Sequence, residues 1–539
     1  MMHAREKILD FAHKEGGDLH IQLIALEKTE DGYTIERKGT GYIITGNNPR
    51  SCLYGVYHLK NGLGEGNFTT SFNIRGIYPC ETLSRHSPDQ IRTLIDRMGA
   101  WRFNTLVIYT DYGYGEHISL IEKECARRGI DIIYYYNTTF QFMQDLIPAK
   151  HFARDPAGRL WTETLLCETR PCFADPEAER IIDRSIDTFF KEKLPSHHTQ
   201  LLFAPADGYK VCLCRHCRRL TPMEQWLPIQ KSLSQGKSVY IPERQLISQV
   251  YIHRYRPPVE LDSYKAVDRI FFDTHQRSRW QPLGREHESR VFHREDEVDW
   301  AARNTPLNIY FLDRIQEWRL KLNKPIVLFE NLMVQGTFSC GQFNTSVLIK
   351  DLKILEQIGV DGILYECFEP GIKSFEDELS HLSLALWDRH YRYRPGKIEE
   401  WAIRHFSRSD VSVNVSTEVG ALGTLIPAVL PSFPWEAAEE ELETSHFKYL
   451  KRFSAFIQSL TPEDAASVID HIYQHNERFD LRFIGFWVLR RLFREKGIRD
   501  LNDKERDFLS YEKLWDFMKA VSMPRETVDA LILSIRKKL

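Results

Sequence analysis

The stretch that decides the fold is Thr199–Cys217, TQLLFAPADGYKVCLCRHC. It contains the apolar run Leu201–Phe203, which is typical of a buried strand, and it breaks at Pro205. Asp207-Gly208 follows at once. A carboxylate just beyond the carboxyl end of a buried parallel strand lies where α/β enzymes carry out their chemistry. The alternative interpretation is a polar turn in which Asp207 hydrogen-bonds its own backbone.

The same pattern of apolar strand, polar turn and amphipathic helix recurs on both sides of this stretch. Counting Leu201–Phe203 as the fourth strand, we expect the others at 72–79, 105–109, 130–136, 246–253, 269–273, 325–330 and 362–366. Eight strands that alternate with helical segments predict a (β/α)₈ TIM barrel of class α/β, because right-handed crossovers close that repeat. The structural alternative is a doubly wound open sheet, but the sequence has no glycine-rich dinucleotide or P-loop motif to favour it.

The regions that flank the repeat predict two further domains. Three short strands, at 18–27, 33–37 and 42–45, are followed by a helix. They predict a small N-terminal α/β domain over residues 1–70, with the barrel over 71–375. A segment resembling a capping box, Ser374–Asp377, begins a long helix, and helical periodicity continues to Leu539. We therefore expect a helical C-terminal domain over residues 376–539.

The composition limits the classes of function. The 539 residues are 42% hydrophobic and 27% charged, which is ordinary for a soluble globular protein. A net charge of −3 gives no reason to expect a nucleic acid or an anionic membrane as partner. Met1–Gly17 has no apolar core of signal-peptide length, and no stretch approaches the roughly 20 apolar residues that span a bilayer. We expect a cytoplasmic protein with reduced cysteines; a homo-oligomer is compatible with this composition.

Active sites of barrels lie on the loops that follow the strands, and this rule selects candidate residues. The candidates for catalysis are Asp207, Glu366 and Glu330. The candidates for substrate binding are Arg85, Asp111, Tyr209, Arg256, Asp273, His275 and Trp280. Flat apolar faces could come from Tyr109, Tyr112, Tyr136, Tyr209, Trp280 and Tyr365. Sugars need such faces together with charged groups for their hydroxyls, and a pair of carboxylates can hydrolyse a glycosidic bond. For any single acid, the alternative is a helix cap or a salt bridge.

Asp207 and Glu366 are expected to face each other across the barrel mouth, with Glu330 as the reserve partner. The apolar surroundings of Glu366, LYECF over residues 364–368, should raise the pKa of its carboxyl by desolvation, which suits a proton donor. Either of the two carboxyls can therefore be the acid and the other the base. The alternative is that Glu366 pairs with an arginine such as Arg75 and only stabilises the barrel.

Several short motifs resemble known glycosidases. Arg75-Gly76, the later Arg85 and the segment 101–104 resemble retaining β-N-acetylhexosaminidases, which carry an Arg-Gly on the first barrel strand and a sugar-binding arginine soon after. The resemblance implies that Arg85 contacts substrate hydroxyls, whereas Arg75 lies within its strand and should brace the barrel core. Residues 41–59 resemble the small α/β domain that precedes the barrel in those enzymes and in α-glucuronidases.

A second set of motifs, Asp207-Gly208 with the cysteines that follow and Leu386–Asp388, is similar to a bacterial group of glycosidase-like barrel proteins. The resemblance covers roughly residues 1–405. Hexosaminidases place an Asp-Glu pair at the end of strand four, where this chain has Asp-Gly, so substrate-assisted cleavage by that pair is not expected. In α-glucuronidases the acid also follows strand four, and that arrangement implies Asp207 as the acid.

Cys212, Cys214 and Cys217 offer three soft metal ligands within six residues. Cys167 or Cys172 could complete a tetrahedral zinc site. The chain has no second Cys-x-x-Cys at zinc-ribbon spacing, so reduced cysteines that pack a loop are the competing interpretation. In both cases we expect the cluster to be structural, because hydrolysis by paired carboxylates requires no cofactor.

The sequence thus predicts a glycoside hydrolase that acts on an oligosaccharide or glycoside, with amino-sugar or uronic-acid substrates included. The main alternative is a non-catalytic carbohydrate-binding barrel, because a fold does not fix a function. A nucleic-acid module built on the cysteines is disfavoured by the net charge and by the lack of interleaved aromatic and basic residues.

Overall fold

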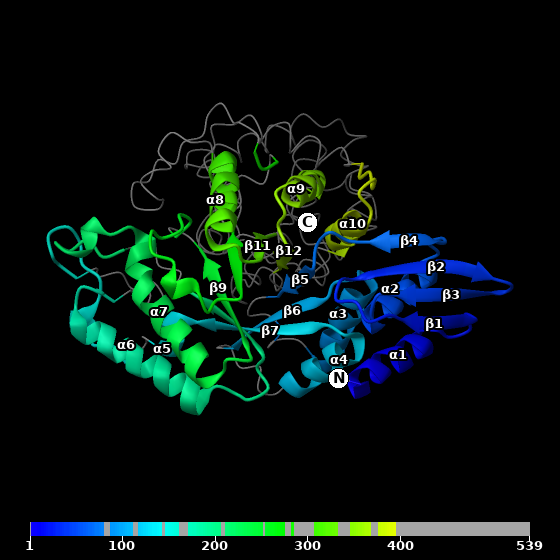
Figure 1. Cartoon of the computed structure of the whole chain (residues 1–539), viewed down its shortest axis with the longest axis horizontal. Coiled ribbons are helices and arrows are strands. Elements are labelled where there is room, and N and C mark those ends of the chain that lie inside the picture. Colours follow the sequence, from blue (N-terminus) through cyan, green and yellow to red (C-terminus); the bar gives the residue numbers. More distant parts are fainter. Residues whose placement is uncertain are drawn as a thin grey trace, which may run out of the picture.

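The computed structural model contains two sheets, a closed barrel and a smaller open sheet beside it (Figure 1). It describes residues 2–79, 83, 87–110, 117–142, 146–160, 171–205, 211–251, 254–274, 277, 282–284, 307–332, 345–367 and 376–394.

The barrel consists of eight parallel strands. They are β5 (Ile74–Tyr78), β6 (Thr105–Tyr109), β7 (Asp131–Asn137), β8 (Gln200–Ala204), β9 (Gln245–Val250), β10 (Arg269–Asp273), β11 (Ile326–Asn331) and β12 (Gly362–Glu366). Each strand follows its neighbour in the ring, and pairing of β12 with β5 closes it. The expected barrel is confirmed, and the alternative of an open sheet is wrong because the first and last strands pair.

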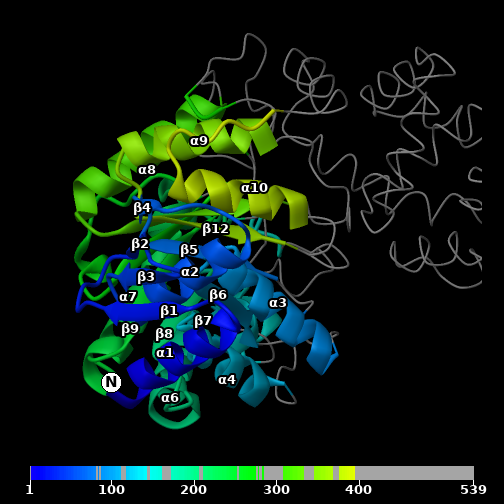
Figure 2. The same ribbon diagram turned by 90° about the vertical axis from the view of Figure 1, so that its right-hand side faces the viewer.

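Helices connect the strands on the outside of the barrel (Figures 1 and 2). They are α3 (Pro88–Ala100), α4 (Ile118–Arg128), the short α5 (Thr138–Phe142), α6 (Pro176–Thr188), α7 (Pro222–Tyr240), α8 (Leu307–Leu322), α9 (Thr345–Gln357) and α10 (Glu376–Trp387). The sequence pattern did not reveal α7, although a capping box between Thr221 and Glu224 starts it. Its buried side includes the polar residues Gln225 and Gln230, which obscure the apolar stripe.

The smaller sheet lies beside the barrel strands β5–β7. It contains β1 (Ile21–Ala25), β2 (Gly32–Lys38), β3 (Gly41–Gly46) and β4 (Gly66–Thr69), in the order β1-β3-β2-β4. The helices α1 (Met2–Gly16) and α2 (Pro49–Lys60) pack against each other, and α1 also contacts α4. Neither α1 nor β4 was expected, because the first contains many charged residues and the second is short and largely exposed. The strand β1 pairs with β3 in parallel; the other pairs are antiparallel.

A buried ion pair joins the smaller sheet to the barrel. The carboxylate of Asp31, next to β2, accepts hydrogen bonds from Arg75 Nη2 on β5 at 2.6 Å and from Arg50 Nε on α2 at 3.1 Å. Burial alone would raise the pKa of Asp31, but the two guanidinium groups outweigh it and hold that pKa well below its usual 3.8. Arg75 also lies over the ring of Trp387 on α10. Arg75 therefore stabilises the junction between the two sheets. The expectation that it braces the barrel core is wrong.

The domain boundaries near residues 70 and 375 stay predictions. Beyond α10 and the few residues after it, the expected helical C-terminal domain lies outside the described residues. Among the described helices, none combines the length and the apolar character needed to cross a membrane.

Asp31→Asn should lower the free energy of unfolding at pH 7 by about 3–5 kcal/mol, because the fully buried Arg75 loses its charged partner and the half-buried Arg50 keeps only Asp131. The pKa of Asp31 is lower in the folded chain, so its contribution is present above pH 3.8 and is lost as the pH falls below that value. Urea unfolding of both proteins should therefore differ most at neutral pH and converge in acid. Asp89→Asn is the control, since that side chain is 91% exposed. Equal losses for Asp31→Asn and Asp89→Asn would contradict the assignment.

Candidate active site at the carboxyl ends of the barrel strands

Ring contacts identify which side chains face the barrel interior. The ring of Tyr78 on β5 lies 5.4 Å from that of Tyr135 on β7 and 5.3 Å from that of Phe329 on β11, between centroids. Neither β7 nor β11 is a neighbour of β5 in the ring of strands. Side chains of such strands meet only inside the barrel, so all three rings face the interior.

The strand register extends this assignment to the ends of the other strands. Paired residues of neighbouring parallel strands share a face, and successive residues alternate between faces. Glu366 pairs with Tyr78, and Asp273 pairs with Phe329. By the same rule, Tyr109, Asn137 and Gln249 also face inward. The mouth of the barrel is therefore lined by carboxylates, amides and tyrosines.

Glu366 ends β12 and is largely buried, but the apolar surroundings expected from the sequence are not confirmed, because the adjacent Tyr365 faces the helices and the inward side chains at this level include polar groups. Its side chain faces inward and the residue is 7% exposed, while its neighbours Tyr365 and Cys367 are fully buried. The alternative in which Glu366 pairs with Arg75 is wrong. Arg75 pairs with Ile363, three residues before Glu366, so its side chain faces outward. Its donors bond Asp31 and two backbone carbonyls.

Glu330 lies elsewhere. It follows Phe329 directly, so it faces the helices. Its carboxylate accepts hydrogen bonds from Arg277 Nε and Thr274 Oγ1, both at 3.0 Å. Arg277 Nη2 also donates to Asp351 on α9 at 2.6 Å. All of these side chains are buried, and burial raises the pKa of Asp351 to about 6 despite the adjacent arginine. The structure brings Glu366 and Asp273 to the mouth of the barrel, but it places Glu330 in the layer between β11 and α9.

Two of the expected substrate-binding residues are described. Gln249 Nε2 donates to Asp273 Oδ2 at 3.0 Å, which holds this inward carboxylate in place. Arg256, in the loop after β9, is partly exposed. The other candidates lie outside the described residues: Asp207, Arg85, Asp111, Tyr209, His275 and Trp280. The end of β8, which precedes Asp207, lies opposite β12 in the ring, with three strands between them on either side.

The aromatic candidates were partly misassigned. Tyr109 faces inward, but Tyr136 stacks on Phe203 and meets Phe189 of the helix layer, and Tyr365 packs against Phe103. Tyr112, like Tyr209 and Trp280, is not described. The rings that fill the lumen, Tyr78, Tyr135 and Phe329, were not selected from the sequence. The sequence carries no signal that selects them, because strands buried on both faces are apolar throughout.

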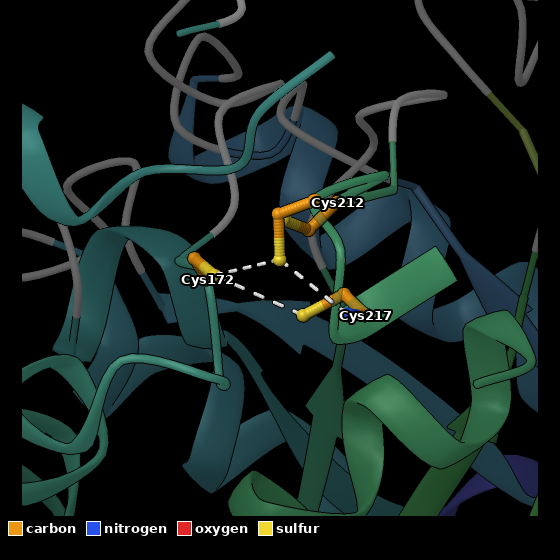
Figure 3. Close-up of side chains that lie close together, drawn as sticks. Cys172, Cys212 and Cys217 are labelled. Atoms are coloured by element: carbon orange, nitrogen blue, oxygen red, sulfur yellow. Dashed lines mark hydrogen bonds between the residues drawn. The ribbon is translucent and has the colours of Figure 1, made fainter. Parts of the chain in front are cut away.

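Four cysteines come together beside the strand ends. The Sγ atom of Cys172, from the loop before α6, lies 3.7 Å from that of Cys214 and 3.8 Å from that of Cys217. With Cys212, the four sulfurs all lie within 4.8 Å of one another and have the geometry to hold a metal ion. Figure 3 shows three of these cysteines, Cys172, Cys212 and Cys217. Hydrogen bonds from Cys172 and Cys217 lower the pKa of the Cys212 thiol well below its usual value. Cys172 is thus the fourth member; Cys167 is not described.

The chain matches no protein-family model and no curated protein by sequence. Its structure is similar to that of a chitobiase from Flavobacterium johnsoniae, with 10% identity, coverage of 99% of this chain and 94% of that one, and a TM-score of 0.48. A GH138 enzyme targeting pectin rhamnogalacturonan II matches with 11% identity, coverage of 98% and 72%, and a TM-score of 0.49. A GH89 protein from Clostridium perfringens, in complex with GlcNAc-α-1,4-galactose, matches with 12% identity, coverage of 98% and 69%, and a TM-score of 0.47. These neighbours are glycoside hydrolases, and at such identities the likeness concerns the fold alone.

Glu330→Gln should lower the free energy of unfolding by about 2–3 kcal/mol, because Arg277 loses a charged hydrogen-bond acceptor in a buried site. Urea unfolding at pH 7 measures the change. Glu243→Gln is the matched control, since Glu243 is 70% exposed and the substitution should change stability by less than about 0.5 kcal/mol. Superimposable unfolding curves for Glu330→Gln and the unmodified chain would show that the ion pair between Glu330 and Arg277 contributes nothing to stability.

Proposed function

We propose that this protein is a glycoside hydrolase that cleaves an oligosaccharide or glycoside with a pair of carboxylates. The observation that carries the proposal is the inward position of Glu366 at the end of β12, level with the ring of Tyr78. Aromatic faces pack against the C–H faces of sugar rings, and inward carboxylates and amides accept and donate hydrogen bonds to hydroxyls. The closed barrel supplies this combination at the end where barrel enzymes bind their substrates.

In this proposal Asp207 and Glu366 form the catalytic pair. One carboxyl group donates a proton to the leaving oxygen, and the other acts as base or nucleophile at the sugar carbon. The opposite positions of β8 and β12 in the ring support the pairing, because a substrate in the mouth then lies between the two strand ends. A carboxyl separation of about 5–5.5 Å would give retention of configuration, and one of about 6.5–9.5 Å inversion. Glu330 is assigned a structural role instead, because its carboxylate is bound to Arg277.

Substrate binding is assigned to the residues around this pair. In this proposal Asp273, whose carboxylate accepts a hydrogen bond from Gln249, accepts hydrogen bonds from sugar hydroxyls, and Arg256 donates them. The remaining candidates keep the roles that the sequence predicts: Arg85, Asp111, Tyr209, His275 and Trp280. The proposed substrates include glycosides of amino sugars and of uronic acids.

The cysteine cluster takes no part in this chemistry, since hydrolysis by two carboxylates uses neither a thiolate nor a cofactor. We assign it a structural role, and its geometry is compatible with a zinc ion.

A panel of 4-nitrophenyl glycosides, including N-acetylhexosaminides and glucuronides, tests the proposal with the full chain. The unmodified protein should hydrolyse at least one of them. Glu366→Gln and Asp207→Asn should each lower kcat by about 10²–10⁴-fold, because each removes a group that transfers a proton or attacks carbon. Glu243→Gln should retain the full rate.

Two outcomes would overturn the proposal. If the unmodified protein binds sugars in calorimetry but hydrolyses none, it is a carbohydrate-binding barrel. If it hydrolyses a glycoside and both variants turn over at its rate, Asp207 and Glu366 are not the catalytic pair.

A further inference from the structure

We propose that Cys172, Cys212, Cys214 and Cys217 bind one Zn²⁺, and that this ion holds together the loops that follow β7 and β8. The inference stands whether or not the protein hydrolyses glycosides, because it depends on the described cysteine loops alone. Figure 3 shows three of the side chains pointing toward one another.

The spacing of the sulfur atoms fits a single ion. In a tetrahedral site with Zn–S bonds of about 2.3 Å, the sulfurs lie about 3.8 Å apart. Cys172 Sγ lies 3.7 Å from Cys214 Sγ and 3.8 Å from Cys217 Sγ, and no two of the four are farther apart than 4.8 Å. Four thiolate sulfurs in a tetrahedron favour zinc or a single iron. The space between them has the size of one ion and not of a multi-iron cluster.

Backbone and side-chain hydrogen bonds orient the ligands. The backbone N–H groups of Cys217 and Arg154 donate to the sulfurs of Cys214 and Cys212, each at 3.4 Å. Such bonds stabilise the negative charge of metal-bound thiolates. Gln225 of α7 holds the loop from behind: its Nε2 donates to the carbonyl oxygens of Cys212 and Cys217, and its Oε1 accepts from the Cys212 N–H, all at 3.1 Å.

The cysteines also form a core of their own. Ala153, Cys172, Cys212 and Cys217 make a buried cluster that is separate from the main core, with Cys214 packed against it. A cluster of sulfurs and one methyl group buries too little apolar surface to hold two loops together. Among the described residues of the two loops, one hydrogen bond between backbone groups crosses here, from Leu213 N–H to Arg154 C=O at 2.7 Å. A metal ion would supply the cohesion that such a small core lacks.

The position of the cluster determines what the ion does. Cys172 belongs to the connection from β7 to α6, and the other three cysteines belong to the connection from β8 to α7. These strands are neighbours, and both loops leave from the barrel end that carries Glu366. Because four protein ligands fill a tetrahedral zinc ion, no position remains for a catalytic water. The ion is therefore a positioning element of the barrel mouth.

Elemental analysis of the full chain, purified without chelator, should find one zinc per chain. After exchange for Co²⁺, the protein should show thiolate charge-transfer bands and the visible bands of tetrahedral cobalt. Cys217→Ala should abolish both the zinc and these bands. Cys125→Ala is the matched control, because Cys125 is a buried thiol of α4 in the main core and its loss should leave the metal content unchanged.

Hydrogen exchange tests the second half of the proposal on the unmodified chain and needs no variant. Removal of the metal should speed exchange at least tenfold in residues 146–160, 171–175 and 211–221 and leave β10–β12 unchanged. A protein without zinc, one that holds iron, or one with a disulfide among these cysteines would overturn the assignment of the ion. Zinc that can be removed without any change in exchange at these loops would overturn its role.

Discussion

The alternation of side chains in a closed barrel of parallel strands is the constraint on which the rest of this structure depends. Each side chain faces either the interior or the helices, and residues paired in register face the same side. The contact of Tyr78 with both Tyr135 and Phe329 shows that these three rings face the interior. The register then places Glu366 and Asp273 inside as well. A shift of one residue would exchange the interior set for the set that packs on the helices.

The Arg-Gly pair of the first barrel strand illustrates this alternation, because its two residues face opposite sides of the barrel wall. Arg75 faces outward and bonds Asp31 of the smaller sheet. Gly76 faces inward, where a Cβ atom would lie 2.6 Å from the backbone oxygen of Thr105 and still closer to the Leu364 side chain. The outward residue connects two sheets, and the inward one lets neighbouring strands close the ring. In this chain both halves of the motif are thus explained by packing, without a substrate.

Sequence reasoning located all eight barrel strands because each is an apolar run bounded by turn residues. It could not orient their ends. Strands buried on both faces are apolar throughout, so the run around Glu330 and the run around Tyr365 carry no alternation from which a face can be read. Cys167 and Cys172 were the two candidates for the fourth ligand. Both lie in one long loop, and its sequence does not show which of them lies near the other three cysteines. The helix α1 was missed because its packing against α2 and α4, not its own composition, stabilises it.

The central claim is that the interior carboxylate Glu366, and not the buried ion-pair partner Glu330, acts on the glycosidic bond. Chemical rescue tests it most directly. Glu366→Ala and Glu330→Ala are each assayed on an activated aryl glycoside with and without azide, and the products are analysed by mass spectrometry. The account predicts that azide restores turnover of Glu366→Ala with formation of a glycosyl azide, and that Glu330→Ala forms none. A glycosyl azide from Glu330→Ala, or a Glu366→Ala variant as active as the unmodified protein on a glycoside with an unactivated alkyl leaving group, would contradict it.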